Sequence, residues 1–312
     1  MEWGNKILAS RMTRFCVFTG CAACLVYFIF QIYEKWDGMG SAVAALAGRH
    51  WLIAAEAAMS ACGILVETLR WSVLRRGFLN GDFRTDFSAT LRAIALGNST
   101  PGNVGEHAGR GLSYTDSGAA AIVSLLASVL QTMNIVLLGA FGAVALISGG
   151  YEVPASAARA IIVFSACCLL AAAVFSLTRG RAWFGRLRDF WSRRAALSVF
   201  ASFTIGLGKT ALFSSQLFLL LGVGCACTSS LYCAVLLYYL CITLTPRVNV
   251  IDVGVKGAWA LAIFGSFVPS ASIITATVSL WAFNIAIPSA IGYAVMAASW
   301  LKKDAMARRH SL

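Results

Sequence analysis

The feature that most constrains this chain is a series of apolar runs, each about as long as a membrane-spanning helix. A helix needs about 20 mainly apolar residues to cross the hydrocarbon core of a bilayer. Charged residues make up only 12% of the 312 residues, and mean hydropathy is +0.77, whereas charged residues make up about 25% of a typical soluble domain. We therefore expect an all-α integral membrane protein, with residues 1–312 forming a single transmembrane domain. Six full spans are predicted at about 15–35, 51–74, 118–147, 158–178, 195–222 and 271–298.

Two further regions, 83–114 and 229–268, are apolar but interrupted by glycine, proline and charge. Basic residues cluster near the N-terminus, in the segments 75–92 and 179–194, and in the C-terminal tail. By the positive-inside rule these segments and both termini are cytoplasmic, and 179–194 is a basic cytoplasmic loop. Each interrupted region must then begin and end on the same side of the membrane. We expect two re-entrant helical hairpins, which a membrane protein tolerates where protein or water shelters the broken backbone.

The predicted spans and hairpins form two units of opposite orientation. The first covers about 51–147 and the second about 195–298, and each contains a span, a hairpin and a span. Many transporters are built from inverted repeats of this kind, with the binding site where the two repeats meet. The net charge of +12 then favours contact with anionic lipid headgroups of the inner (cytoplasmic) membrane, not with nucleic acid.

Both hairpins contain a related charged motif. The first reads Pro101-Gly-Asn-Val-Gly-Glu-His-Ala-Gly-Arg110, and the second reads Pro246-Arg-Val-Asn-Val-Ile-Asp-Val-Gly-Val-Lys256. In each, an acidic residue follows the proline by five or six positions, and a basic residue lies four positions further on, which places both charges on one face of a helix. The base could attract a phosphate and the acid an ammonium group or a proton, while helix breaks expose backbone N–H groups to an anion. The candidate binding residues are Gly102, Gly105, Glu106, Arg110, Asn249, Asp252 and Lys256.

Further polar residues inside the predicted spans are candidates for lining the same cavity. Each buried charge costs roughly 3 kcal/mol at the centre of a bilayer, so it is expected to have a partner or a function. The alternative is structural: the charged motifs are ion pairs that only lower this cost, and the polar side chains hold helices together. Ten cysteines lie mostly in apolar runs and lack zinc spacing, so we expect no metal and no cofactor. The supporting candidates are Glu67, Arg70, Gln131, Lys209, Gln216 and Asn284.

Several of these motifs resemble the lysylphosphatidylglycerol synthase transmembrane region family, also called the flippase-like domain. The resemblance is most specific in the first hairpin, from Thr100 to Arg110. It continues through Glu67-Thr-Leu-Arg-Trp71, the stretch 209–216, Asp252-Val-Gly-Val-Lys256 and Trp281-Ala-Phe-Asn284. Where the resemblance leads one to expect arginine, this chain has Lys209 and Lys256, so charge is kept but bidentate arginine geometry is lost.

The resemblance implies a unit that moves lipids across the bilayer. Well-known members are fused to a synthase or a glycosyltransferase domain, and the hydrophilic segments of this chain are too short for either, so it resembles a stand-alone, non-enzymatic member. The expected partners are a phospholipid or lipid-linked substrate, the surrounding membrane lipids, and either further copies of the chain or a separate lipid-modifying enzyme. The main alternative is a non-transporting subunit of an envelope-lipid or glycolipid synthesis complex. An intramembrane enzyme would need a nucleophile and base, and only His107 beside Glu106 offers a partial set.

Overall fold

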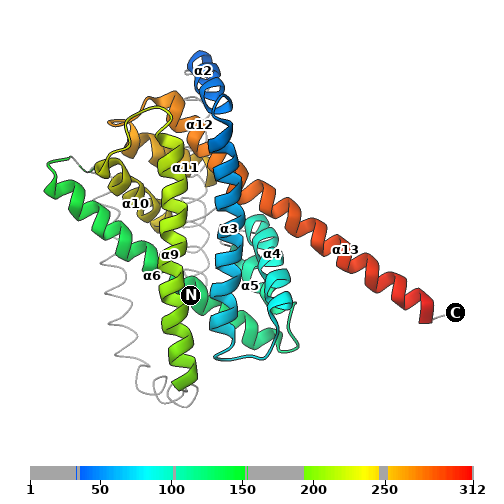
Figure 1. Ribbon diagram of the computed structural model, residues 1–312. Helices are drawn as coiled ribbons and strands as arrows, with labels where there is room; N and C mark the ends of the chain where they lie inside the picture. The colour runs from blue at the N-terminus through cyan, green and yellow to red at the C-terminus, as the bar shows by residue number, and fades with distance from the viewer. Residues whose placement is uncertain are drawn as a thin grey trace, which may run out of the picture.

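The computed structural model describes residues 33, 36–100, 103–151, 153, 193–245 and 252–310, and within these ranges the chain is helical without strands (Figure 1). Its long helices are α3 (His50–Arg75), α6 (Ser117–Ser148) and α9 (Arg193–Leu221). A fourth long stretch joins α12 (Ser270–Trp281), the π-helix η3 (Ala282–Ala286) and α13 (Ile287–His310). The shorter helices are α2 (Trp36–Ala47), α4 (Phe83–Ser99), α5 (Val104–Gly111), α10 (Ser229–Leu244) and α11 (Asp252–Phe264).

Four helices are long and apolar enough to cross a membrane: α3, α6, α9 and the stretch Ser270–Ala298. They confirm long apolar helices at the positions of the spans predicted at 51–74, 118–147, 195–222 and 271–298. The other two predicted spans, 15–35 and 158–178, and most of the predicted basic loop lie outside the described residues. Helix α2 was not predicted, because its 12 residues are too few for the span-length criterion.

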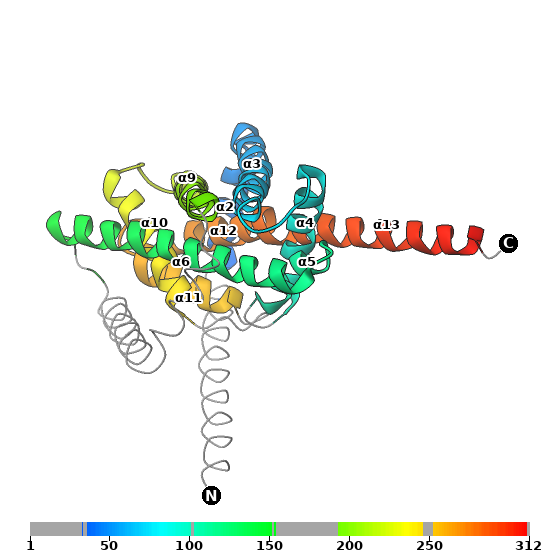
Figure 2. The ribbon, with the colours of Figure 1, turned by 90° about the horizontal axis from the view of Figure 1, so that it is seen from below.

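Helices α3 and α9 run side by side in opposite directions, and α6 crosses them obliquely (Figures 1 and 2). The end of α3 lies close to the start of α9. A Cβ atom added to Gly77, just after α3, would lie only 2.9 Å from Cβ of Ser198 in α9. The first part of α13 packs against α4, and its C-terminal part projects away from the other helices (Figure 2). One face of α6 exposes large apolar side chains and suits contact with lipid tails: Ile122, Leu125, Val129, Met133, Leu137, Phe141 and Val144.

The first interrupted region forms α4 and α5, which pack closely against each other after a break near Thr100. Asn103, just before α5, has a φ of 59°, a left-handed conformation that asparagine tolerates better than most residues. Thr100 Oγ1 accepts the N–H of Gly105 at 2.6 Å and donates to the Leu96 carbonyl at 3.0 Å. A Cβ atom added to Gly105 would collide with that carbonyl. Gly105 therefore allows the backbones of α4 and α5 to approach.

The second interrupted region forms α10 and α11, and residues 246–251 between them are not described. Helix α10 packs on α6 at two glycines. A Cβ atom added to Gly139 would lie 2.5 Å from Cβ of Leu240. One added to Gly142 would lie 2.6 Å from the carbonyl oxygen of Cys233. Small residues allow such close helix packing in membrane proteins. Thus both halves have the order long helix, two shorter helices, long helix, and the breaks occur where the sequence predicted them.

Candidate functional site

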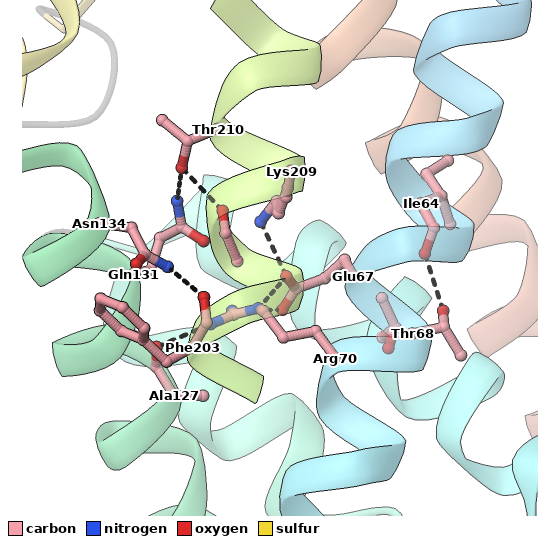
Figure 3. Close-up of polar contacts among 12 residues, drawn as sticks. Ile64, Glu67, Thr68, Arg70, Ala127, Gln131, Asn134, Phe203, Lys209 and Thr210 are labelled. Atoms are coloured by element: carbon pink, nitrogen blue, oxygen red, sulfur yellow. Dashed lines mark hydrogen bonds and ion pairs between the residues drawn. The ribbon is translucent and has the colours of Figure 1, made fainter. Parts of the chain in front are cut away.

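A single buried carboxylate is the centre of the polar interior. Glu67 on α3 is 6% exposed, and Figure 3 shows it between α3 and α9. Arg70 Nε lies 2.9 Å from Oε2 and Arg70 Nη2 lies 2.9 Å from Oε1. Lys209 Nζ of α9 lies 2.8 Å from Oε2, and Arg110 Nη2 of α5 pairs with Oε1. Three cations thus share one anion in a region from which water is largely excluded.

Glu106 and Arg110 form the ion pair that their spacing predicted, with Glu106 Oε1 3.3 Å from Arg110 Nη2. We call Glu67, Arg70, Glu106, Arg110 and Lys209 the Glu67 cluster. The Arg110 guanidinium also lies over the Trp71 ring, 4.6 Å from its centroid. Its Nε and Nη1 atoms are buried without a hydrogen-bond partner among the described residues. Arg110 therefore has two buried donor atoms that no described residue accepts from.

Arg70 has a different position in the cluster. Its Nη1 donates to the Ala127 carbonyl of α6 at 2.9 Å, in addition to its two bonds to Glu67 (Figure 3). All three guanidinium nitrogens of Arg70 thus have protein partners. Arg70 is only 2% exposed, so it does not extend toward an aqueous interface. It ties α3 to α6 and orients the Glu67 carboxylate.

Two amide side chains of α6 connect this helix to α9. Gln131 Nε2 donates to Thr210 Oγ1 at 2.9 Å, and Asn134 Nδ2 donates to the Phe203 carbonyl at 3.1 Å (Figure 3). Each leaves its side-chain oxygen without a hydrogen-bond partner among the described residues. Gln131 also lines a cavity, whereas Asn134 is fully buried between helices. Gln131 thus belongs to the cavity lining, and Asn134 acts as a helix contact.

Two cavities adjoin the Glu67 cluster, with volumes of about 180 Å³ and about 680 Å³. Glu67 and Arg110 line the smaller cavity, Arg70 lines the larger one, and Glu106 and Lys209 line both. The larger volume lies within the 300–1,000 Å³ typical of ligand pockets. The residues common to both linings, Asn98, Asn103, Glu106, Lys209, Phe213 and Asn284, show that the cavities are adjacent.

The larger cavity is lined by both halves of the chain. Lys256 of α11 lines it together with Glu106 of α5, so a residue from each predicted charged motif faces one space. Asp252 is the first residue of α11. Asn249 and Gly102 lie outside the described residues. The acid of the first motif and the base of the second thus line a common cavity.

The remaining predicted residues divide between the cavity and its support. Asn284, in the π-helix, lines both cavities, and its Nδ2 donates to Gln216 Oε1 at 3.0 Å. Gln216 is fully buried and lines neither cavity. Gly105 lines neither cavity, and its N–H is donated to Thr100. It therefore has a packing role, and its N–H is not directed at a ligand.

Several lining residues were not among the sequence candidates. Asn98 follows the pattern of a glycosylation acceptor, yet it lines both cavities and its Nδ2 donates to Ser289 Oγ at 2.9 Å. His107 lines the larger cavity, and its Nδ1 lies 2.9 Å from Ser124 Oγ. Asn98 lies just before the motif that ends at Arg110, and His107 lies within it. These positions were the sequence signal that could have identified both as lining residues. The other lining residues, including Phe213 and Tyr239, come from helices whose packing the sequence does not specify.

The described side chains around the two cavities give the site an excess of positive charge. Two carboxylates, Glu67 and Glu106, face four cationic groups, Arg70, Arg110, Lys209 and Lys256, so the formal net charge of these six groups is +2. Within the part of the chain that the structure describes, no cluster of His, Cys, Asp or Glu is suited to hold a metal ion. Cationic groups and amide donors that line a cavity are suited to bind an anion such as a phosphate.

No protein-family model matches this sequence, and no curated protein matches it significantly.

Proposed function

We propose that the protein moves a phosphate-containing lipid, or a lipid-linked headgroup, across the inner membrane. The observation that carries this proposal is the pair of adjacent, positively charged cavities lined by both halves of the chain, beside which Arg110 has two donor atoms without a partner among the described residues. A fully buried guanidinium with two unpartnered nitrogens is costly in a protein without a ligand. If the guanidinium turned toward the cavity, a phosphate oxygen accepting from those nitrogens, which are buried in this conformation, would remove that cost.

The headgroup would bind between the Glu67 cluster and the second charged motif. Arg110 and Lys209 would hold the phosphate, with Glu67 keeping both cations in place. Glu106, whose side chain is 23% exposed, would accept a hydrogen bond from an ammonium or hydroxyl group of the headgroup. The amides of Asn98, Asn103 and Asn284 would complete the polar lining.

The proposal includes the membrane arrangement expected from the sequence. The pairs α4–α5 and α10–α11 would be re-entrant hairpins within two inverted repeats, and both termini would be cytoplasmic. The opposite directions of α3 and α9 and the common helix order of the two halves support this arrangement. Movement of one repeat against the other would open the cavity to each leaflet in turn. The resemblance to the flippase-like domain favours the same class of activity.

The proposal can be tested by lipid scrambling in liposomes that contain the purified protein. Fluorescent anionic, zwitterionic and aminoacylated lipids would be compared for wild type, Glu106→Gln and Arg110→Gln. Matched controls are Arg92→Gln on α4 and Asp116→Asn before α6, since neither residue lines a cavity. Asparagine also preserves the N-terminal cap that Asp116 provides to the N–H of Ala119.

We expect wild type and both controls to move at least one phosphate-containing lipid, and both cavity variants to lose most of that movement while remaining folded. Movement that is equal in wild type and the cavity variants would contradict the assigned site. If folded wild type moves none of the lipids, the account of the protein as a translocase is wrong and a membrane subunit of a lipid-synthesis complex becomes the better explanation.

A further inference from the structure

A second glutamate on α3 lies outside the Glu67 cluster and has a very different environment. Glu56 precedes Glu67 by eleven residues, about three helical turns, and its side chain is fully buried. Both of its carboxylate oxygens lack a hydrogen-bond partner among the described residues, and no described cation forms an ion pair with it. Glu67 on the same helix has three cationic partners. The two carboxyl groups are therefore expected to differ in protonation.

The surroundings of Glu56 supply little compensation for a negative charge. Of the elements packed against α3, α6 and η3 contain no ionisable residue, and the only one in α2 is Asp37. Helix α9 contributes Lys209, which Glu67 holds. The charged residues of α4 include Asp86, which pairs with Arg75 at the far end of α3.

From α10, Tyr239 lies near enough to interact electrostatically with Glu56, but its hydroxyl donates to the Phe213 carbonyl at 3.1 Å. An ionised carboxylate buried without a partner costs several kcal/mol. The neutral acid leaves only ordinary polar groups unpaired, at about 1–3 kcal/mol each. The geometry therefore favours a protonated Glu56 in this conformation.

The backbone around Glu56 is connected to the cavity lining through two hydrogen bonds. Gln216 Nε2 donates to the Glu56 carbonyl at 3.4 Å, and Gln216 Oε1 accepts from Asn284, which lines both cavities. One turn later, Ser60 donates to the Phe283 carbonyl of the π-helix at 2.6 Å. The part of α3 that holds Glu56 is thus joined to both α9 and η3. A charge formed at Glu56 would disturb the packing of helices that shape the cavity.

We propose that Glu56 is a proton-binding site, and that binding and release of its proton are coupled to movement of the substrate. This proposal rests on the proposed function and adds its driving force. In the conformation described, Glu56 holds the proton in a closed helix contact. In the opposite conformation its carboxyl group gains access to water and releases the proton, so that each cycle carries one proton with the substrate.

The protonation state can be measured directly by infrared spectroscopy of the purified, detergent-solubilised protein. The variant Glu56→Gln resembles the neutral acid in shape, and Asp116→Asn removes an exposed carboxylate as a control. We expect wild type at neutral pH to show the carbonyl band of a protonated carboxylic acid, the control and Glu106→Gln to retain it, and Glu56→Gln to lose it. A spectrum in which Glu56→Gln loses a carboxylate band instead would overturn the proposal.

The coupling can be measured in liposomes with an imposed pH gradient. For one coupled proton, the steady-state ratio of substrate between the leaflets shifts by up to about tenfold per pH unit, because one unit corresponds to a tenfold change in an equilibrium constant. We expect wild type and Asp116→Asn to show such a shift. Glu56→Gln should move lipid without responding to the gradient. A gradient response in Glu56→Gln equal to that of wild type would refute the coupling.

The two experiments separate this proposal from the function on which it rests. If wild type moves no lipid but shows the acid band, the proposed function fails and Glu56 still binds a proton. If wild type moves lipid and Glu56→Gln shows no change in its acid band, the function stands and the proton site is refuted.

Discussion

Two buried arginines in this protein, Arg75 and Arg110, have nearly the same low exposure but very different partners. Arg75, at the end of α3, has Nε 2.6 Å from Asp86 Oδ1 and Nη2 2.9 Å from Asp86 Oδ2. Its remaining donors reach the carbonyls of Leu79 and Gly81, both at 2.9 Å. Every guanidinium nitrogen of Arg75 is therefore paired by the protein, and the residue lines neither of the two cavities.

Arg110 shares Glu67 with two other cations and leaves two nitrogens unpaired among the described residues, while it lines a cavity. A fully paired buried charge has its desolvation compensated by the fold itself, so its natural role is to hold helices together. A partly paired charge beside a cavity leaves that compensation to a ligand. Pairing, and not burial alone, therefore separates an arginine with a structural role from one proposed to bind a ligand. Three substitutions test it, in order of their expected effect on stability.

Asp86→Asn should have the largest effect on stability. It removes the carboxylate of the Arg75 pair and leaves a buried cation, at a cost of about 3–5 kcal/mol in the free energy of unfolding. Thermal unfolding in detergent would measure the loss. The double variant Arg75→Met, Asp86→Leu should recover most of it, because it removes both charges. A loss below about 1 kcal/mol for the single variant would show that the pair is not structural.

Tyr114→Phe should have an intermediate effect. The Tyr114 hydroxyl donates to Asp86 Oδ1 at 2.5 Å and accepts from Trp71 Nε1 at 2.8 Å. Burial, followed by the hydrogen bond to Asp86, raises the pKa of this hydroxyl, so it stays a neutral donor across the physiological range. Removing it leaves the Trp71 N–H unpaired, which costs about 1–3 kcal/mol. Lipid movement should persist, and its loss in a folded variant would place the network around Tyr114 in the transport site.

Arg110→Gln should have the smallest effect on stability and the largest on function. Glu67 keeps Arg70 and Lys209 as partners, so the change should cost about 1 kcal/mol or less, the range of a single net hydrogen bond. Unfolding curves would be compared with those of Arg92→Gln, the same substitution away from the cavity. If Arg110→Gln destabilises the protein as much as Asp86→Asn, then Arg110 is a structural residue and the comparison fails.

The sequence predicts local features of this molecule well. The four long apolar helices follow from their apolar length, and the ends of α4 and α10 follow from Pro101 and Pro246, since the residue before a proline disfavours helix. The spacing of Glu106 and Arg110 predicts their ion pair, since four residues bring two side chains to one helix face. These features depend on residues close together in the chain.

The centre of the site could not be predicted in the same way. Glu67 meets Lys209, which is 142 positions away, and that contact depends on how α3 and α9 pack. The π-helix that carries Asn284 likewise has no distinct sequence signal. The sequence suggested that Gly105 offers its N–H to a ligand. In the structure the hydroxyl of Thr100 accepts that N–H instead. Such tertiary contacts decide which polar residues face the cavity.

Native mass spectrometry of protein–lipid complexes can test whether Arg110 and Lys209 bind a phosphate group in the cavity. Wild type, Arg110→Gln and Arg92→Gln would be titrated with a short-chain anionic phospholipid and with a neutral diacylglycerol of the same chain length. We predict that the phospholipid binds wild type and Arg92→Gln with equal affinity and binds Arg110→Gln at least about tenfold more weakly, the loss of about 1.4 kcal/mol expected for one charged hydrogen bond. Equal affinity of all three proteins for the phospholipid, or equal affinity of wild type for both lipids, would contradict the claim.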